Sequence, residues 1–244
     1  MLLKELDRFP RAILVAGCQR SGTTVLARTI TQSEGIEKYW IGRDDELDAA
    51  LILSGCREKE YKGKRFCFQT TYLNECYEEY YAHSDYQLLW MVRNPHSVVY
   101  SMIKNWKRFA LNELYESCGK SSLVGCPPER NRGLGRWWIP SIVKACASYN
   151  AKVEQIVDIT RKVGSDKVAL IEYEELVTKP ELLLPKIYEF IGVGYHKSYM
   201  AKLSRRSINK SRELGAKPSS QISKLSMPYY QKAKNLMAEY GITL

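Results

Sequence analysis

Short apolar runs alternate along the chain with stretches in which apolar residues recur at helical spacing. Four runs have the length and the branched or aromatic content of buried strands: residues 12–16 (AILVA), 65–70 (RFCFQT), 86–92 (YQLLWMV) and 167–173 (KVALIEY). Helices are expected between them, and this alternation is typical of βαβ units. The pattern therefore predicts an α/β fold of three layers, with a mainly parallel central sheet and helices on both faces.

The longest predicted helix covers about residues 138–162, where apolar residues keep a helical period until Gly164 stops it. One further predicted helix follows the first strand and runs to about Thr31. Two others cover about 45–54 and 96–109, and a fourth begins at Pro180. In the helix over 45–54, Leu47, Ala50 and Leu51 share one face.

Residues 111–136 interrupt this alternation with short polar and glycine-containing clusters and two prolines. They predict a long loop or lid, and such loops in compact domains tend to be functional or mobile. A chain of 244 residues that is 45% apolar can bury one sizeable core, so a single domain over residues 1–244 is expected.

The formal net charge of +10, from 37 Lys and Arg against 27 Asp and Glu, is spread along the chain. A basic surface suits an anionic ligand, with nucleic acid as the competing explanation, but no DNA- or RNA-binding signature is present and no nucleic-acid partner is expected. Seven scattered cysteines without a C-x-x-C pair indicate thiols in a reducing compartment, not a zinc site. The apolar run before Gly17 is too short for a membrane span, so a soluble, cytoplasmic chain is expected.

The segment GCQRSGTT, which begins at Gly17, follows the first predicted strand and leads into a helix. Gly17 and Gly22 keep the spacing of a nucleotide-hydrolysing P-loop, G-x-x-x-x-G-K-[ST], but Thr23 stands in place of the lysine. A glycine-rich turn at a helix N-terminus binds an anion through backbone N–H groups and the helix dipole. Arg20 adds a planar, charged fork. Without the lysine or an acidic strand end for Mg²⁺, β,γ-phosphate chemistry is unsupported and no metal ion is expected.

This loop resembles the 5′-phosphosulfate loop of the sulfotransferases that use 3′-phosphoadenosine 5′-phosphosulfate (PAPS), which share a P-loop-like α/β fold with nucleotide kinases. The motif LLWMVRNPHSVVYSM resembles the family's 3′-phosphate site, with Arg93 at a strand end, then Pro95, then Ser101. IEYEELVTKP resembles a third family motif, whose tyrosine, here Tyr173, lies beside the adenine.

The resemblance implies that PAPS and its product PAP are bound by the following residues: Arg20, Ser21, Gly22, Thr23, Thr24, Arg93, Ser101 and Tyr173, with Ser207 and Lys210 of SINKSRELG closing over the nucleotide. It further implies in-line transfer of the sulfuryl group to a hydroxyl or amine of a small-molecule or glycan acceptor, which extends to lipids and peptides. Charge that grows on the departing phosphate would be stabilised by Arg20, the loop amides and Thr23.

The family's base is a histidine in the branch that acts on small phenols and steroids, but His83, His96 and His196 stand in no matching context. The carbohydrate- and protein-modifying branches instead use a carboxylate at the start of the helix after the loop helix, where GRDDELDAA stands. The candidates there are Glu46, which corresponds best, then Asp45, and Asp44, which is also a possible helix cap. Acids in a first helical turn stabilise the helix whatever its function.

Two other functions remain open at this stage. A P-loop nucleotide kinase or phosphotransferase would require Mg²⁺ and ATP, and the absent lysine argues against it. A non-catalytic nucleotide- or RNA-binding protein is supported by the net charge and by tyrosine-rich stretches such as YEEYYAH. Trp106, Trp137 and Trp138 form either an aromatic platform for a sugar or anchors of the core.

Overall fold

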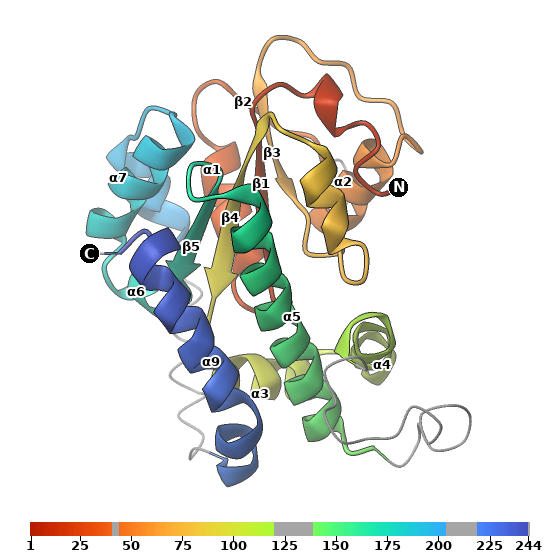
Figure 1. The fold of residues 1–244 in the computed structure, drawn as a ribbon. Coiled ribbons are helices and arrows are strands. Elements are labelled where there is room, and N and C mark those ends of the chain that lie inside the picture. The colour runs from red at the N-terminus through yellow and green to blue at the C-terminus, as the bar shows by residue number, and fades with distance from the viewer. Residues whose placement is uncertain (41–43, 120–138, 204–218, 244) are drawn as a thin grey trace.

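The computed structural model describes residues 1–40, 44–119, 139–203 and 219–243 (Figure 1). Its centre is a five-stranded sheet in the order β2-β3-β1-β4-β5, in which every pair of neighbouring strands is parallel. The strands are β1 (Ala12–Gly17), β2 (Ile36–Glu37), β3 (Arg65–Gln69), β4 (Tyr86–Val92) and β5 (Val168–Glu172). The predicted α/β fold with its parallel sheet is confirmed, and β2 is a short strand that the apolar pattern did not predict.

The helices of the described residues are α1 (Thr23–Thr31), α2 (Asp45–Leu53), α3 (Pro95–Asn105), α4 (Arg108–Ser117), α5 (Ser141–Val163), α6 (Tyr173–Thr178), α7 (Pro180–Ile191) and α9 (Ser220–Tyr240). Three 3₁₀ segments join them: η1 (Leu6–Arg8), η2 (Tyr77–Ala82) and η6 (Lys197–Lys202). Gly164 follows α5 with φ 92° and ends it, as its position in the sequence predicts.

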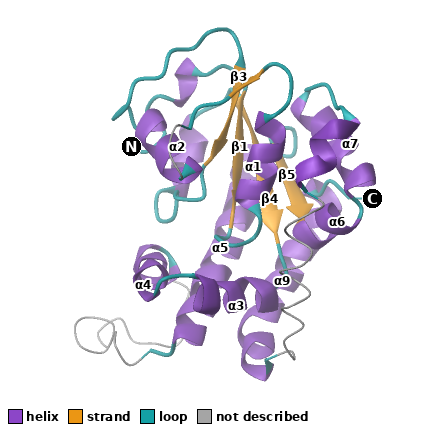
Figure 2. Cartoon of the chain, turned by 180° about the vertical axis from the view of Figure 1, so that it is seen from behind, coloured by secondary structure: helices purple, strands orange, loops and turns teal. Residues whose placement is uncertain are grey.

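Alternate residues of β1 point to opposite faces of the sheet and enter two separate apolar clusters. Leu14 belongs to the cluster formed with α2, α5 and α9, whereas Ile13 and Val15 belong to the cluster formed with α1, α6 and α7. Figure 1 shows α5 and α9 in front of the sheet, and Figure 2, seen from behind, shows α1 and α7 over the other face. The three predicted layers are therefore present, and burial on both faces explains why β1 is continuously apolar.

The helix predicted over residues 96–109 is two helices in the structure. α3 ends at Asn105, Trp106 is extended (φ −104°, ψ 150°), and α4 begins at Arg108. Because α4 continues to Ser117, the first part of the segment predicted as a loop or lid over 111–136 is helical. Residues 120–136 of that segment lie outside the described residues.

The face of α2 that carries Leu47, Ala50 and Leu51 is not its buried face. Leu47 is 56% exposed, and Ala50 and Leu51 are only partly buried. Asp45 and Ala49 are buried in their place. The periodicity misleads here because a polar residue, Asp45, is buried through an ion pair that no hydrophobic pattern reveals.

α9 is absent from the sequence-based prediction although it is one of the longest helices described. Its interior contains Pro228, which usually argues against a helix, and few of its side chains are fully buried. Those few keep helical spacing: Ile222, Ser226, Ala233 and Met237. Among the described residues, no helix combines the length and the apolar character needed to cross a bilayer.

Candidate active site

The turn between β1 and α1 has the backbone conformation of an anion-binding loop. Gly17 and Gly22 have φ values of 141° and 97°, which favour glycine. A Cβ on Gly22 would lie 2.4 Å from Cδ2 of Tyr173, so close approach also requires glycine there. Ser21 is fully buried and its hydroxyl donates to the carbonyl of Cys18 over 2.5 Å, which closes the turn. The first amides of α1 lack intrahelical acceptors and can therefore receive an anion.

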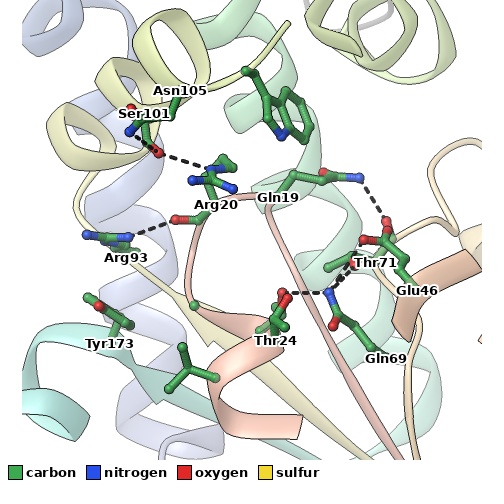
Figure 3. A pocket seen from close by; sticks show the side chains of 14 residues that line it. Gln19, Arg20, Thr24, Glu46, Gln69, Thr71, Arg93, Ser101, Asn105 and Tyr173 are labelled. Atoms are coloured by element: carbon green, nitrogen blue, oxygen red, sulfur yellow. Dashed lines mark hydrogen bonds between the residues drawn. The ribbon is translucent and has the colours of Figure 1, made fainter. Parts of the chain in front are cut away.

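A cavity of about 670 Å³ opens where β1, β3 and β4 end (Figure 3). Ligands of open parallel sheets bind at this edge, outside the carboxyl ends of the strands. The cavity is lined by Gln19, Arg20, Gly22, Thr23, Thr24, Val25, Glu46, Gln69, Thr71, Arg93, Ser101, Asn105, Trp106 and Tyr173. It thus brings together most of the site residues that the sequence predicts, from three motifs far apart along the chain.

Two arginines form the cationic side of this cavity. Arg20 donates from Nε to the hydroxyl of Ser101 over 3.0 Å, and Arg93 donates from Nη1 to the carbonyl of Arg20 over 2.8 Å. The guanidinium carbon of Arg93 lies 4.0 Å from the centre of the Tyr173 ring. Burial and the charge of Arg93 lower the pKa of Arg20, because neighbouring cations in a partly buried site repel each other. An anion between them would relieve that repulsion.

The backbone around Arg93 is fixed from two sides. Its carbonyl accepts a hydrogen bond from the hydroxyl of Tyr149 on α5 over 3.0 Å. The next amide, that of Asn94, donates to Oε1 of Glu174 over 3.2 Å, and this carboxylate oxygen lies 3.9 Å from Nε of Arg93. Burial raises the pKa of Glu174, while Arg93 opposes that rise. These contacts hold the arginine at the end of β4 and over Tyr173.

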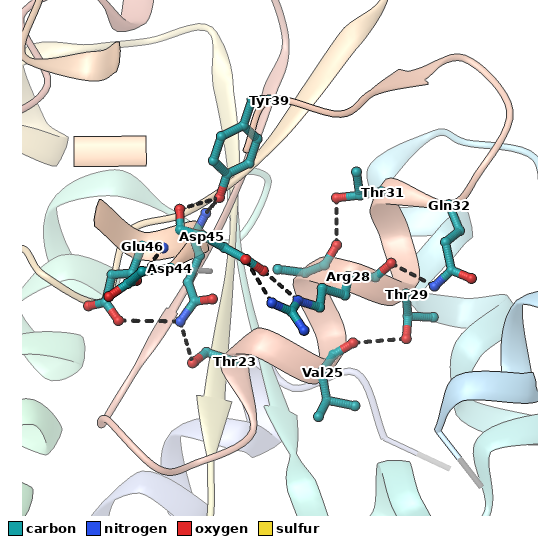
Figure 4. A network of polar contacts seen from close by, with 12 residues as sticks. Thr23, Val25, Arg28, Thr29, Thr31, Gln32, Tyr39, Asp44, Asp45 and Glu46 are labelled. Carbon is teal, nitrogen blue, oxygen red and sulfur yellow. Dashed lines mark hydrogen bonds and ion pairs between the residues drawn. The ribbon is translucent and has the colours of Figure 1, made fainter. Parts of the chain in front are cut away.

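Asp44 and Asp45, the first two acids of GRDDELDAA, make contacts that stabilise the fold (Figure 4). Oδ1 of Asp44 accepts hydrogen bonds from the amides of Glu46 and Leu47, each over 3.1 Å, so Asp44 caps α2 as the sequence allows. Asp45 is 3% exposed, and its two carboxylate oxygens accept from Nε and Nη2 of Arg28 over 2.6 and 2.8 Å. Asp45 does not line the cavity, because its side chain ties α2 to α1.

Glu46 is the carboxylate that lines the cavity among the three acids. Burial raises its pKa to about 7, the charge of Asp44 adds to that rise, and a hydrogen bond with Thr71 and the charge of Lys152 oppose it. Near neutral pH this side chain therefore exchanges a proton readily, which is the property of an efficient general base.

Gln69 and Thr71 are site residues that the sequence analysis did not identify. Nε2 of Gln69 lies 3.3 Å from the hydroxyl of Thr23, 3.2 Å from that of Thr71 and 3.4 Å from Oε2 of Glu46. Gln19, also unidentified, donates from Nε2 to the carbonyl of Thr71 over 3.0 Å. Their positions in the sequence could have identified all three residues, because each follows or ends a predicted parallel strand, at the edge where such sheets bind ligands.

The other residues that the sequence predicts for the site differ in where they lie relative to the cavity. The side chain of Ser21 faces the loop's own backbone instead of the cavity. Trp106 lines the cavity, as an aromatic platform would. Ser207, Lys210, Trp137 and Trp138 lie outside the described residues.

None of the three histidines lines the cavity in the part of the chain that the structure describes. Nδ1 of His83 contacts Asp7 at 2.9 Å, Nε2 of His96 contacts the hydroxyl of Ser223 at 3.3 Å, and Nδ1 of His196 contacts the hydroxyl of Ser198 at 2.7 Å. Each ring therefore has a contact elsewhere in the fold, which agrees with the absence of a matching histidine motif in the sequence.

A parallel sheet with a lysine-free phosphate-type loop, two adjacent arginines and a carboxylate in one cavity defines an α/β group-transfer protein for an anionic donor. The model of the sulfotransferase domain family matches residues 10–236, and the chain therefore belongs to this family of enzymes, which use PAPS. No curated protein sequence matches the chain.

Solved structures share the fold at low sequence identity. The sulfotransferase domain from the curacin biosynthetic pathway is 14% identical, with a TM-score of 0.60 over 94% of this chain and 98% of that one. The sulfotransferase domain of the Synechococcus PCC 7002 olefin synthase is 13% identical, with a TM-score of 0.61 over 97% and 98%. A sulfotransferase from Alicyclobacillus acidocaldarius is 16% identical, with a TM-score of 0.53 over 93% and 94%.

Proposed function

We propose that this sulfotransferase moves the sulfuryl group of PAPS to a hydroxyl or amine of an acceptor, with Glu46 as the general base. The observation that carries the proposal is the presence of Glu46 in the same cavity as the loop of Thr23 and the arginine pair. A carboxylate base would relate the chain to the carbohydrate- and protein-modifying branches of the family instead of the histidine branch.

The residues present fit PAPS. Arg20 and Arg93 repel each other across a partly buried site, and two guanidinium groups suit a ligand that carries several phosphate and sulfate oxygens. The open amides at the start of α1 add donors for the 5′-phosphosulfate. We assign the 3′-phosphate to Arg93 and Ser101, and the adenine to the neighbourhood of Tyr173. When bound, PAPS supplies the sulfuryl group and a bisphosphate that can leave.

The chain's own residues supply orientation and proton transfer. The hydroxyl of Ser101, and the Arg93 guanidinium that donates to the Arg20 carbonyl, hold Arg20 against the loop, so its charge is preorganised where negative charge develops on the leaving phosphate. Glu46 accepts the proton of the acceptor's hydroxyl or amine as that group attacks. Gln69, which lies between Thr23 and Glu46, fixes the distance between the donor loop and the base.

Replacing Glu46 by Gln tests the base. The variant keeps the shape of the side chain but cannot accept a proton, so the rate of labelled sulfate transfer should fall about a hundredfold or more, whereas PAP affinity by calorimetry stays constant. In the parent, Glu46 is protonated below its pKa, so kcat/KM should fall as the pH drops below about 7. Full turnover in Glu46→Gln would rule out the carboxylate mechanism.

The acceptor is to be found by measuring transfer of labelled sulfate from PAPS to a panel of glycans, lipids, peptides and phenols. Trp106 beside the neutral polar side chains of Gln19, Gln69 and Asn105 favours a polyhydroxy acceptor over a charged one. Transfer to phenols alone would contradict this preference while leaving the PAPS assignment intact.

A further inference from the structure

Lys152 on α5 is a buried cation that the proposed chemistry does not use directly. It is 2% exposed, and its Nζ donates to the carbonyls of Thr71 and Leu73 over 3.2 and 3.3 Å. Burying an ammonium group is unfavourable unless charge and hydrogen bonds compensate for the lost hydration. The two neutral carbonyls compensate only in part. A negatively charged group near Lys152 is therefore needed to balance the buried ammonium.

Burial lowers the pKa of Lys152, and the described groups whose negative charge opposes that loss of the proton are two thiols and one carboxylate: Cys118, Cys18 and Glu46. Burial raises the pKa of both Cys18 and Cys118, so both remain neutral thiols at physiological pH. Glu46 is thus the acid that can balance the ammonium. Conversely, the charge of Lys152 lowers the pKa of Glu46, against the larger effect of burial.

Lys152 is the cation among the described charges that act on the carboxylate of Glu46, although Arg20 and Arg93 line the same cavity. The other ionisable groups that interact with Glu46 are Asp44 on its own helix, Tyr39 before that helix, and Tyr72 and Tyr80 after β3. Burial raises the pKa of each of these tyrosines, which keeps them neutral, and Asp44 carries a charge of the same sign as Glu46. Only Lys152 in this set favours the ionised carboxylate.

Lys152 also determines the geometry of the segment beside the base. Thr71, whose carbonyl Lys152 and Gln19 both contact, lines the cavity, and its hydroxyl accepts from Nε2 of Gln69, which also donates to Glu46. A second contact, to Leu73, makes the lysine span two carbonyls of one turn. The ammonium therefore acts on Glu46 by charge and through the position of Thr71.

We propose that Lys152 is a positioning residue for the transfer reaction: it fixes the turn that carries Thr71 and supplies the buried positive charge that keeps Glu46 ionised for proton acceptance. This inference rests on the proposed role of Glu46. It concerns a side chain that is not among the residues lining the cavity.

The test replaces Lys152 by Met, a side chain of similar length without charge. Loss of the cation disfavours the ionised carboxylate, so the acidic limb of the kcat/KM profile should move to higher pH by roughly half a unit or more. Activity should accordingly fall several-fold near pH 6.5 and recover largely at about pH 9, with PAP affinity unchanged. Lys152→Gln, which is also neutral, carries the same test if the Met variant does not fold.

Lys144→Met is the matched control. Lys144 is another buried lysine on α5, 4% exposed, whose Nζ donates to Oδ1 of Asn112 over 2.8 Å. Its removal should leave the position of the acidic limb unchanged, because it is not among the charges that act on Glu46. A purely structural effect of Lys152 would lower kcat equally at every pH, and that result would overturn the inference.

A second readout separates this inference from the function on which it rests. The Glu46 carboxyl carbon can be titrated by NMR in glutamate-labelled protein, assigned with Glu46→Gln. Its midpoint should rise in Lys152→Met by the same shift as the rate profile. An unmoved midpoint overturns the role of Lys152, whereas a raised midpoint with an unmoved rate profile overturns Glu46 as the base.

Discussion

Arg20 adopts a left-handed backbone conformation (φ 73°), which residues other than glycine rarely take. Its strain is held by contacts at both ends of the residue: its carbonyl accepts from Arg93, and its Nε donates to Ser101. Strained backbone that persists under such contacts is common at functional sites. At the scale of single residues, the loop therefore presents a side chain whose position is fixed before any ligand binds.

Arg20→Ala and Arg93→Ala should each weaken PAP binding by about tenfold to a hundredfold. The physical reason is the loss of charge-assisted hydrogen bonds, each of which contributes about 1.5–3 kcal/mol. Isothermal calorimetry with PAP measures the change. Arg161→Ala is the control, because the Arg161 side chain is 71% exposed on α5. Parental PAP affinity in both cavity variants would show that the nucleotide binds elsewhere.

At the scale of elements, the orientation of α2 determines which acid reaches the cavity. The Asp45 ion pair with Arg28 joins α2 to α1, and Tyr39 donates to the carbonyl of Asp45 over 2.9 Å. Successive residues of a helix point in different directions, so fixing Asp45 toward α1 directs Glu46 elsewhere. The cap at Asp44 fixes where the helix begins.

Asp45→Asn should destabilise the protein by ~1–3 kcal/mol, because Arg28 loses its buried carboxylate partner and the charge-assisted hydrogen bonds to it, a loss limited by the partial solvation of Arg28. Urea unfolding measures the change, and transfer activity should fall less than in Glu46→Gln. The control is Glu60→Gln in the exposed pair with Lys62, where stability should change by less than about 0.5 kcal/mol. Parental stability with abolished transfer in Asp45→Asn would instead make Asp45 the reacting acid.

At the scale of the whole molecule, the ligand that the protein binds distinguishes a sulfotransferase from a kinase or an RNA-binding protein. A ligand that binds only the native state raises its apparent stability, by about 2.7 kcal/mol at a hundred times its Kd. PAP should raise Tm markedly, whereas ATP with Mg²⁺ and a short RNA should raise it little.

Sulfate transfer should also survive excess EDTA, since no cluster of three His, Cys, Asp or Glu in the described chain is arranged for a metal ion. Stabilisation by ATP that requires Mg²⁺, with loss of transfer on chelation, would contradict this.

The sequence by itself determined the α/β layering and the glycine positions of the first loop, because both are local. Four of the strands followed from continuous apolar runs, since a strand buried on both faces admits little else. The phosphate-type loop followed from glycine spacing and from Arg20, because backbone conformation and charge depend on the residues themselves.

Only the tertiary structure decided which polar groups meet. The sequence ranks Glu46 above Asp45 and Asp44 by resemblance alone, whereas Arg28, the cavity and Lys152 distinguish the three acids in space. Gln69, Thr71 and Lys152 carried no motif, since their importance comes from contacts between β3, α2 and α5 that are distant along the chain. Hydrophobic periodicity describes burial of apolar surface, whereas the pKa of Glu46 depends on its own burial, on Thr71 and on the charges of Lys152 and Asp44, and that arrangement exists only in the folded chain.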